Sequence, residues 1–194
     1  VPRRVLIASS ANIYGNAAGG MLDEATPPQP VNHYAVSKLA MEHMVRTWHD
    51  RLPIVMTRPF NYTGVGQSPS FLVPKIVSHF TRREPVIELG NIDIERDFSD
   101  VRMVARVYRA LLEADCAGQT VNVCSGRAYA LRDIVSMMQE IAGYAIEVRV
   151  NPAFVRYSDV RTLAGSSAKL NALVGAAAAM PMPFDETLRW MVTA

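Results

Sequence analysis

The chain has 194 residues, of which 49% are hydrophobic, so it can bury a sizeable core and is not expected to be disordered. Twenty Lys and Arg residues and 18 Asp and Glu residues give a net charge of +2, and the sequence has no basic run. Nucleic acid is therefore not expected as a partner. The longest uncharged apolar run is broken by Asn171, Pro181 and Pro183, so no membrane span is expected. Two cysteines without a CxxC motif, and no secretory signal, are typical of a cytoplasmic protein.

Short apolar runs alternate with helical patterns along the chain, which predicts an α/β fold on a parallel sheet. Strands are expected at residues 4–9, 53–57, 85–89, 120–124 and 146–150. Helices are expected at residues 32–51, 71–81, 100–113, 131–142 and 184–192, with Ser99 as the cap of the third. The segments 16–31 and 59–69, rich in Gly and Pro, are expected to be loops.

Chemically useful side chains gather near the N-terminus. Tyr34 and Lys38 lie four residues apart on a predicted helix, so both project from one face. An ammonium beside a phenol stabilises the phenolate and lowers its pKa from the free value of about 10, so Tyr34 is expected to exchange a proton near neutral pH. Ser9 and Ser10 end a predicted strand, at the edge where α/β sheets bind ligands, and the Ser10 hydroxyl could hydrogen-bond a carbonyl oxygen.

Three segments, ASSANIYG, NHYAVSKLAME and MTRPFNYTGVGQ, together resemble the extended short-chain dehydrogenase/reductases that act on nucleotide-diphosphate sugars. The later segments LGNIDIERDFSDVRMV, VNVCSG and NPAFVRYSDVRTLAGSSAKL are most similar to GDP-4-keto-6-deoxy-D-mannose reductases and their neighbour, GDP-mannose 4,6-dehydratase. The resemblance implies a catalytic triad of Ser10, Tyr34 and Lys38, with Tyr34 as proton donor to the C4 carbonyl of the sugar. It also implies a homodimer through the Tyr34–Lys38 helix, whose back face carries Met44, Val45 and Trp48.

The same resemblance implies NADP as the cofactor, with NAD as the alternative, and a GDP-sugar as the substrate. The cofactor-binding residues that it indicates are Ser9, Tyr34, Lys38, Pro59, Phe60 and Asn61. The substrate-binding residues that it indicates are Asn61, Arg96, Asp159 and Arg161. Arginine suits such a substrate because its planar fork matches phosphate oxygens.

One feature of the family is missing from the sequence. None of the eleven glycines has the GxxGxxG spacing that brings a helix N-terminus to the cofactor pyrophosphate. We therefore expect an incomplete Rossmann-type parallel sheet that lacks its N-terminal βαβαβ half, joined to a smaller α/β substrate-binding domain. Residues 1–60 and about 100–125 are assigned to the cofactor domain, and about 61–99 and 126–194 to the substrate domain.

Three functions stay open. The first is NADP-dependent reduction of the C4 ketone of GDP-4-keto-6-deoxy-D-mannose, giving GDP-D-rhamnose or its C4 epimer, by the parent protein. The second is a GDP-mannose 4,6-dehydratase or another nucleotide-sugar epimerase or dehydratase, although dehydratases place an acidic residue where this sequence has Asn12. The third is a catalytically silent nucleotide-sugar binding fragment. The four histidines show no metal-ligand spacing, so no metal site is expected.

Overall fold

The computed structural model describes residues 2–15, 20–155 and 162–194. Its first sheet is parallel, with the strand order β1-β3-β7, and consists of β1 (Val5–Ala8), β3 (Ile54–Pro59) and β7 (Thr120–Val123). All six residues of β3 are buried, as the predicted strand at residues 53–57 leads one to expect for the first four, whereas the residues of β1 are half-buried or exposed. The difference arises because β1 is an edge strand of this sheet and β3 is the central one.

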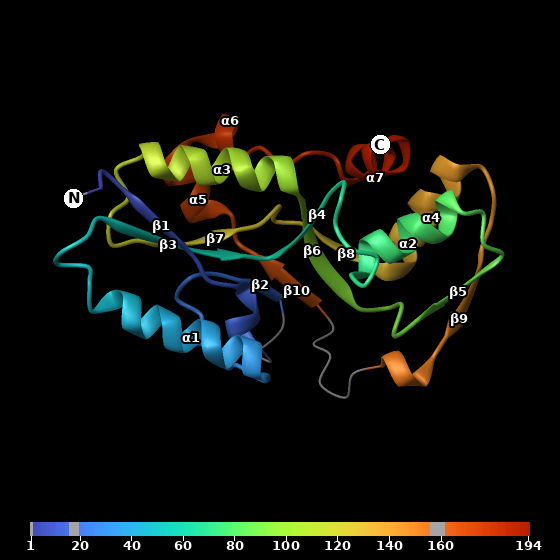
Figure 1. Ribbon diagram of the computed structural model, residues 1–194, viewed down its shortest axis with the longest axis horizontal. Helices are drawn as coiled ribbons and strands as arrows, with labels where there is room; N and C mark the ends of the chain where they lie inside the picture. Colours follow the sequence, from blue (N-terminus) through green and yellow to red (C-terminus); the bar gives the residue numbers. More distant parts are fainter. Residues whose placement is uncertain (1, 16–19, 156–161) are drawn as a thin grey trace.

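Helices cover both faces of this sheet. Figure 1 shows α1 (His33–Arg46) and α3 (Val101–Glu113) on opposite sides of it. The period-two alternation of β3 serves both helices, because Val55 packs with the apolar face of α3 while Arg58 reaches Glu42 of α1. Two short helices, α5 (Ala168–Val174) and α6 (Ala176–Ala179), pack beside α3.

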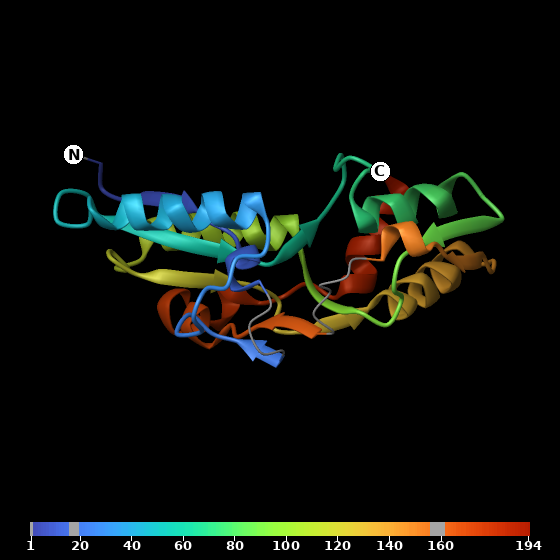
Figure 2. The same ribbon diagram turned by 90° about the horizontal axis from the view of Figure 1, so that it is seen from below.

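A second sheet forms the middle of the molecule, as Figure 2 shows from another side. Its strands run in the order β2-β10-β6-β4, with β8 antiparallel to β6. These strands are β2 (Gly20–Leu22), β4 (Asn61–Thr63), β6 (Glu95–Asp100), β8 (Ala128–Ala130) and β10 (Thr162–Gly165). Only one residue separates β3 from β4, so the backbone passes directly from the first sheet into the second.

The remaining elements build a second lobe around its own apolar core. The strands β5 (Val86–Leu89) and β9 (Glu147–Val150) pair in parallel. They are accompanied by α2 (Leu72–Thr81), α4 (Leu131–Ala142) and α7 (Phe184–Thr193), with the 3-10 helix η2 (Pro152–Phe154) after β9. Phe98 of β6 and Tyr129 of β8 both contact the ring of Phe184, which anchors α7 to the middle sheet.

The structure confirms the expected strands and helices, adds the unpredicted strands β6, β8 and β10, and corrects three details. The segment 16–31 contains β2 and the segment 59–69 contains β4, so neither is wholly a loop. The first helix ends at Arg46, before the predicted limit at residue 51, and turns follow it. Asp100, not Ser99, caps α3, because the Asp100 carboxylate accepts a hydrogen bond from the Arg102 backbone N–H.

The division into a cofactor domain and a substrate domain stays a prediction. One segment assigned to the substrate domain packs against elements of the cofactor domain. Residues 168–179 belong to the expected substrate domain, yet Leu170 and Ala179 join the core formed by α3, β3 and β7. Among the described residues, no helix is both long and apolar enough to cross a membrane.

Candidate active site

The carboxyl end of β1 is the starting point of the site. Ser9 and Ser10 follow this strand, and both are nearly buried, at 3% and 8% exposure. Ser10 is the N-cap of the 3-10 helix η1 (Ala11–Tyr14), where its Oγ accepts a hydrogen bond from the Asn12 backbone N–H at 3.2 Å. The Ser10 hydroxyl is therefore fixed at the sheet edge while its own proton stays available for another acceptor.

The first turns of α1 bring Tyr34 and Lys38 to the same place. Asn32 caps this helix by accepting a hydrogen bond from the Ala35 N–H at 2.8 Å, which sets where the helix begins. Lys38 Nζ donates to the Ala8 carbonyl at 2.9 Å and lies 5.8 Å from the centre of the Tyr34 ring. Ala8 directly precedes Ser9, so the ammonium joins the helix to the end of β1. The Tyr34 side chain is half exposed, which leaves its hydroxyl accessible.

The segment that leaves β3 forms the next part of the site. Pro59 ends β3, and the Phe60 N–H donates to the Val123 carbonyl at 2.9 Å, while the Phe60 ring is buried. Asn61 opens β4 with an exposed side chain, and its Nδ2 donates to the Asp97 carbonyl at 3.2 Å. This side-chain hydrogen bond fixes the Asn61 amide against the backbone of the neighbouring strand β6.

Of the predicted substrate-binding residues, Arg96 lies on β6 next to Asp97 and is partly buried. Its Nη1 donates to the Glu95 carbonyl at 2.8 Å. Asp159 and Arg161 lie outside the described residues. The structure thus places Arg96 and Asn61 on the neighbouring strands β6 and β4, and Ser10, Tyr34 and Lys38 around the end of β1.

Two buried polar features near these residues, a carboxylate and an ion pair, were not predicted from the sequence. The first is Asp97, which is fully buried and accepts hydrogen bonds from the backbone N–H groups of Ser125, Gly126 and Gly165 and from the Ser125 hydroxyl. Burial raises the pKa of Asp97 above its usual value, although these hydrogen bonds oppose the shift. Asp97 therefore ties β6 to β10 and to the segment after β7.

The second is an ion pair between Arg58 of β3 and Glu42 of α1, both buried. Burial opposes the Glu42 charge, but the two hydrogen bonds from Arg58 outweigh it and hold the pKa of Glu42 below its usual value. The sequence signal was present, because an arginine that continues an apolar strand needs a buried partner. Glu42, one turn after Lys38, is the matching acid on the predicted helix.

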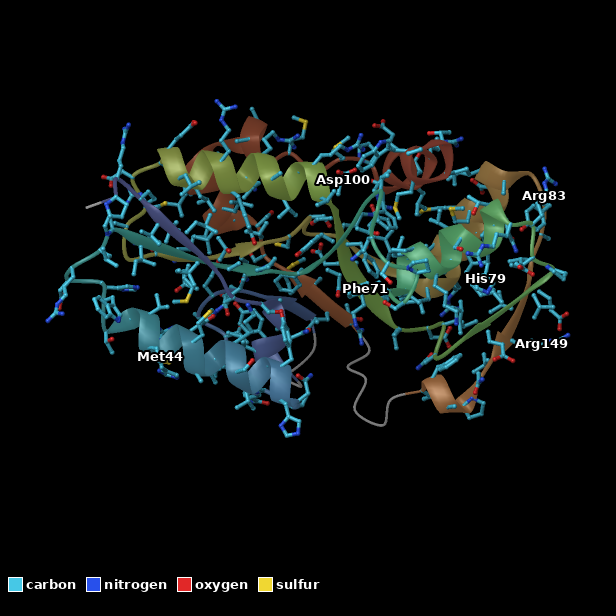
Figure 3. The ribbon with its side chains drawn as sticks, viewed as in Figure 1. Met44, Phe71, His79, Arg83, Asp100 and Arg149 are labelled. Carbon is cyan, nitrogen blue, oxygen red and sulfur yellow. The ribbon has the colours of Figure 1, made fainter. Side chains whose placement is uncertain are left out.

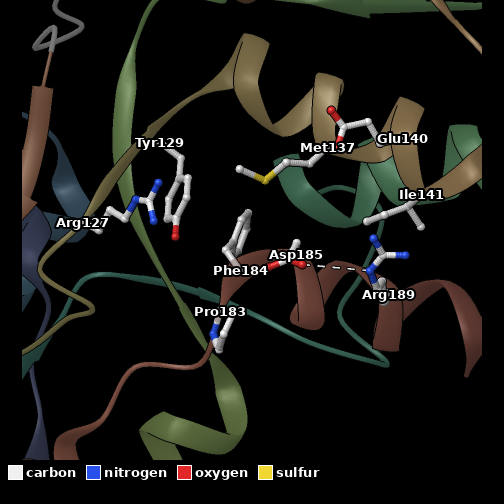
Figure 4. A pocket seen from close by; sticks show the side chains of 9 residues that line it. All are labelled: Arg127, Tyr129, Met137, Glu140, Ile141, Pro183, Phe184, Asp185 and Arg189. Atoms are coloured by element: carbon white, nitrogen blue, oxygen red, sulfur yellow. Dashed lines mark ion pairs between the residues drawn. The ribbon is translucent and has the colours of Figure 1, made fainter.

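A cavity of about 260 Å³ lies apart from these residues, between β8, α4 and α7 (Figure 4). Tyr129 and Phe184 line its apolar side, and Asp185 and Arg189 form an ion pair of 4.0 Å along α7. None of the predicted site residues lines it. In the described part of the chain, His, Cys, Asp and Glu side chains form no group of three or more that could hold a metal ion.

Comparisons with known proteins identify the family to which a chain with this fold and this sheet edge belongs. Residues 2–191 match the family described as GDP-mannose 4,6 dehydratase. The chain is 39% identical to the GDP-6-deoxy-D-talose 4-dehydrogenase of Aggregatibacter actinomycetemcomitans and 35% identical to the GDP-6-deoxy-D-mannose reductase of Pseudomonas aeruginosa. Each alignment covers 88% of this chain but only 58% and 59% of the relative.

Solved structures give the same result. RMD of Pseudomonas aeruginosa, complexed with NADPH, superposes with a TM-score of 0.89 at 32% identity, over 98% of this chain and 65% of that one. A Burkholderia cenocepacia protein described as a candidate epimerase reaches a TM-score of 0.96 at 57% identity, over 99% and 63%. The chain therefore belongs to the GDP-mannose 4,6-dehydratase family. It has the Rossmann-type α/β fold of that family and spans about three fifths of the length of these relatives.

Proposed function

We propose that this chain carries the catalytic residues and the sugar-binding part of an NADP-dependent reductase of GDP-4-keto-6-deoxy-D-mannose. The product would be GDP-D-rhamnose or its C4 epimer. The observation that carries the proposal is the position of Lys38, whose Nζ lies 2.9 Å from the Ala8 carbonyl and beside the Tyr34 ring, at the strand end that holds Ser10. The names of the talose 4-dehydrogenase and mannose reductase relatives support C4 redox chemistry on a GDP-sugar.

Three side chains would share the work at the C4 carbonyl. Ser10 Oγ already accepts from a backbone N–H, so its own O–H is free to donate to the carbonyl oxygen. Tyr34 would transfer a proton to that oxygen as negative charge develops on it. Lys38 would stabilise the phenolate that remains on Tyr34.

The chain fits one end of the cofactor and lacks the motif for the other. Around the end of β1, Lys38, Ser9 and the segment of Pro59, Phe60 and Asn61 offer an ammonium and backbone groups to a nicotinamide and its ribose. When bound, NADPH supplies the hydride that C4 receives. We assign these contacts, except that of Asn61 at the boundary, to residues 1–60 and about 100–125. The GDP-sugar contacts of Asn61, Arg96, Asp159 and Arg161 belong to residues about 61–99 and 126–194.

Asn12 favours reduction over dehydration. Dehydration removes the C5 proton and expels the C6 hydroxyl, which requires a further acid and base. Asn12 occupies the place of the acidic residue that dehydratases use, and its carboxamide cannot exchange a proton at neutral pH. Reduction of a C4 ketone needs only a hydride from NADPH and a proton from Tyr34, with Ser10 and Lys38 stabilising the charge that develops.

Cofactor binding gives the first experimental test. We expect NADPH fluorescence to change little with the 194-residue chain alone. It should respond strongly to an intact form, meaning this chain preceded by a cofactor half with a GxxGxxG turn. Tight NADPH binding by the chain alone would contradict the assignment of the pyrophosphate site to a segment outside these 194 residues. Weak binding by both forms would favour the alternative of a silent nucleotide-sugar binding module.

We further propose that the intact form is a homodimer paired through α1. Val36 and Met44, eight residues apart, lie on the exposed side of this helix, and their exposed fractions are 52% and 70%. Trp48, just after the helix, is 49% exposed. Figure 3 shows Met44 on the outer side of α1, away from the sheet. Apolar surface of this kind is typical of a helix that pairs with a second copy.

The Met44→Glu substitution tests this pairing. It should convert the dimer to a monomer at micromolar concentration, as measured by light scattering, because it places a charge in an apolar interface. Met180→Glu, which changes another exposed methionine, directly after α6 and far from α1 in the chain, should leave the mass unchanged. A wild-type intact form that is monomeric would contradict the proposed dimer.

A further inference from the structure

A buried ion pair connects the helix and the strand on which the candidate catalytic residues depend. Arg58 Nε donates to Glu42 Oε1 at 2.9 Å, and Arg58 Nη2 donates to Glu42 Oε2 at 2.7 Å. The two side chains are 3% and 0% exposed. Two parallel hydrogen bonds between planar groups fix the distance and also the angle between α1 and β3, which a single contact would not do.

The same guanidinium also holds the segment after β1. Arg58 Nη1 donates to the Tyr14 hydroxyl at 3.0 Å, and the guanidinium lies 5.1 Å from the centre of the Tyr14 ring. Tyr14 in turn donates to Asn122 Oδ1 of β7 at 2.7 Å. One arginine therefore joins α1, η1, β3 and β7 in a single buried network.

Each partner in this network stands a short way along the chain from a proposed site residue. Glu42 follows Lys38 by one helical turn, Tyr14 ends the 3-10 helix that Ser10 caps, and Arg58 directly precedes Pro59. We propose that Arg58 and Glu42 are positioning residues, which hold Lys38, Ser10 and the segment after β3 in register without touching the substrate. This role rests on the proposed reductase function.

A purely stabilising role would explain the pair less well. Taking two charges out of water is costly, and well-packed apolar side chains of similar size often stabilise a fold as well or better. What such side chains cannot supply is the directed, three-way hydrogen bonding of the guanidinium to Glu42 and Tyr14. The difference allows an experiment in which stability and positioning are separated.

The main test uses the double variant Glu42→Met/Arg58→Met in the intact form. Its melting temperature should stay near that of the wild type, because no unpaired charge is left buried. Its kcat should fall by about 10²-fold, since a displacement of catalytic groups by about 1 Å can cost that much. The KM for the nucleotide sugar should change much less than kcat, because Arg96 lies on β6 outside the network and Asn61 is also held by the Asp97 carbonyl. A kcat equal to that of the wild type would overturn the positioning role.

The milder variant Tyr14→Phe covers the case in which the double variant does not fold. It removes one hydroxyl and leaves the Arg58–Glu42 pair in place, and it should lower kcat less than the double variant, again without a change in KM. An unchanged kcat in Tyr14→Phe would overturn the role of Arg58 toward η1. Glu113→Gln is the matched control, because it breaks the exposed Arg109–Glu113 pair on α3 and should alter neither kcat nor KM.

A second readout does not depend on turnover. The chain has three lysines, and the ammonium groups of Lys38 and Lys75 each donate to a backbone carbonyl, at 2.9 and 2.7 Å. In NMR spectra of protein with ¹⁵N-labelled lysine, the side-chain ammonium signal of Lys38 should broaden in the double variant. The ammonium signal of Lys75, a residue outside the network, should not change. An unchanged Lys38 signal would overturn the proposal. A broadened signal in an intact protein that reduces no sugar would support the positioning role and refute the proposed reaction.

Discussion

The substitution Tyr34→Phe is expected to lower the kcat of the intact form for the 4-keto sugar by about 10²-fold or more. Phenylalanine keeps the ring beside the Lys38 ammonium but lacks the hydroxyl that would give a proton to the C4 oxygen. Because half of the Tyr34 side chain is exposed and its ring supports no core, stability should not change. Binding of the nucleotide sugar, measured by calorimetry, should be largely retained.

The control for this variant is Tyr144→Phe. Tyr144 lies in the second lobe against Phe80, and its hydroxyl is 3.4 Å from backbone carbonyl groups, so its loss should not affect kcat. If Tyr34→Phe turns over at the wild-type rate, Tyr34 has no part in proton transfer and the proposed mechanism is wrong.

The substitution Lys38→Met is expected to impair two properties together. The methionine keeps most of the apolar stem but loses the charge that would stabilise the Tyr34 phenolate, so kcat should fall by about 10²-fold. It also loses the ammonium that would bind the nicotinamide ribose, so the Kd for NADPH, measured by fluorescence, should rise. The hydrogen bond to the Ala8 carbonyl disappears as well, and with it the link between α1 and the end of β1.

Lys75→Met provides a matched comparison, because Lys75 also donates to a backbone carbonyl, that of Glu88, and also lies over an aromatic ring, that of Phe154. It should leave kcat and the Kd for NADPH unchanged. A Lys38→Met variant that lowers kcat without any effect on NADPH binding would restrict Lys38 to the catalytic step.

The regular elements could be predicted because their signals are local. The apolar runs around β1, β3, β5 and β7 and the spacing of apolar residues in α2, α3 and α4 need no knowledge of the rest of the chain. The sequence did not reveal β6, because Glu95, Arg96 and Asp97 interrupt any alternating apolar pattern. Their partners lie on β10 and after β7, so only the folded topology explains how these charged residues fit a strand.

The site residues also fall into those that local sequence predicts and those that depend on tertiary structure. Tyr34, Lys38 and Ser10 were predictable, since helical spacing and a strand end place them together. Asp97 was not, because its hydrogen-bond donors lie 28 to 68 residues further along the chain. Arg58 and Glu42 are 16 residues apart on different elements, and their pairing depends on how α1 packs against β3. For this pair the sequence offers only the candidate partners, an arginine that continues an apolar strand and an acid on the predicted helix, and tertiary structure joins them.

The central claim is that the intact form reduces a C4 ketone, and one assay with two substrates tests it. NADPH oxidation should occur when the intact form receives GDP-4-keto-6-deoxy-D-mannose. GDP-mannose with NADP⁺ should give no keto sugar, because Asn12 cannot act as the additional acid or base. Formation of the keto sugar from GDP-mannose without an added dehydratase would contradict the account, as would a failure to oxidise NADPH with the keto sugar.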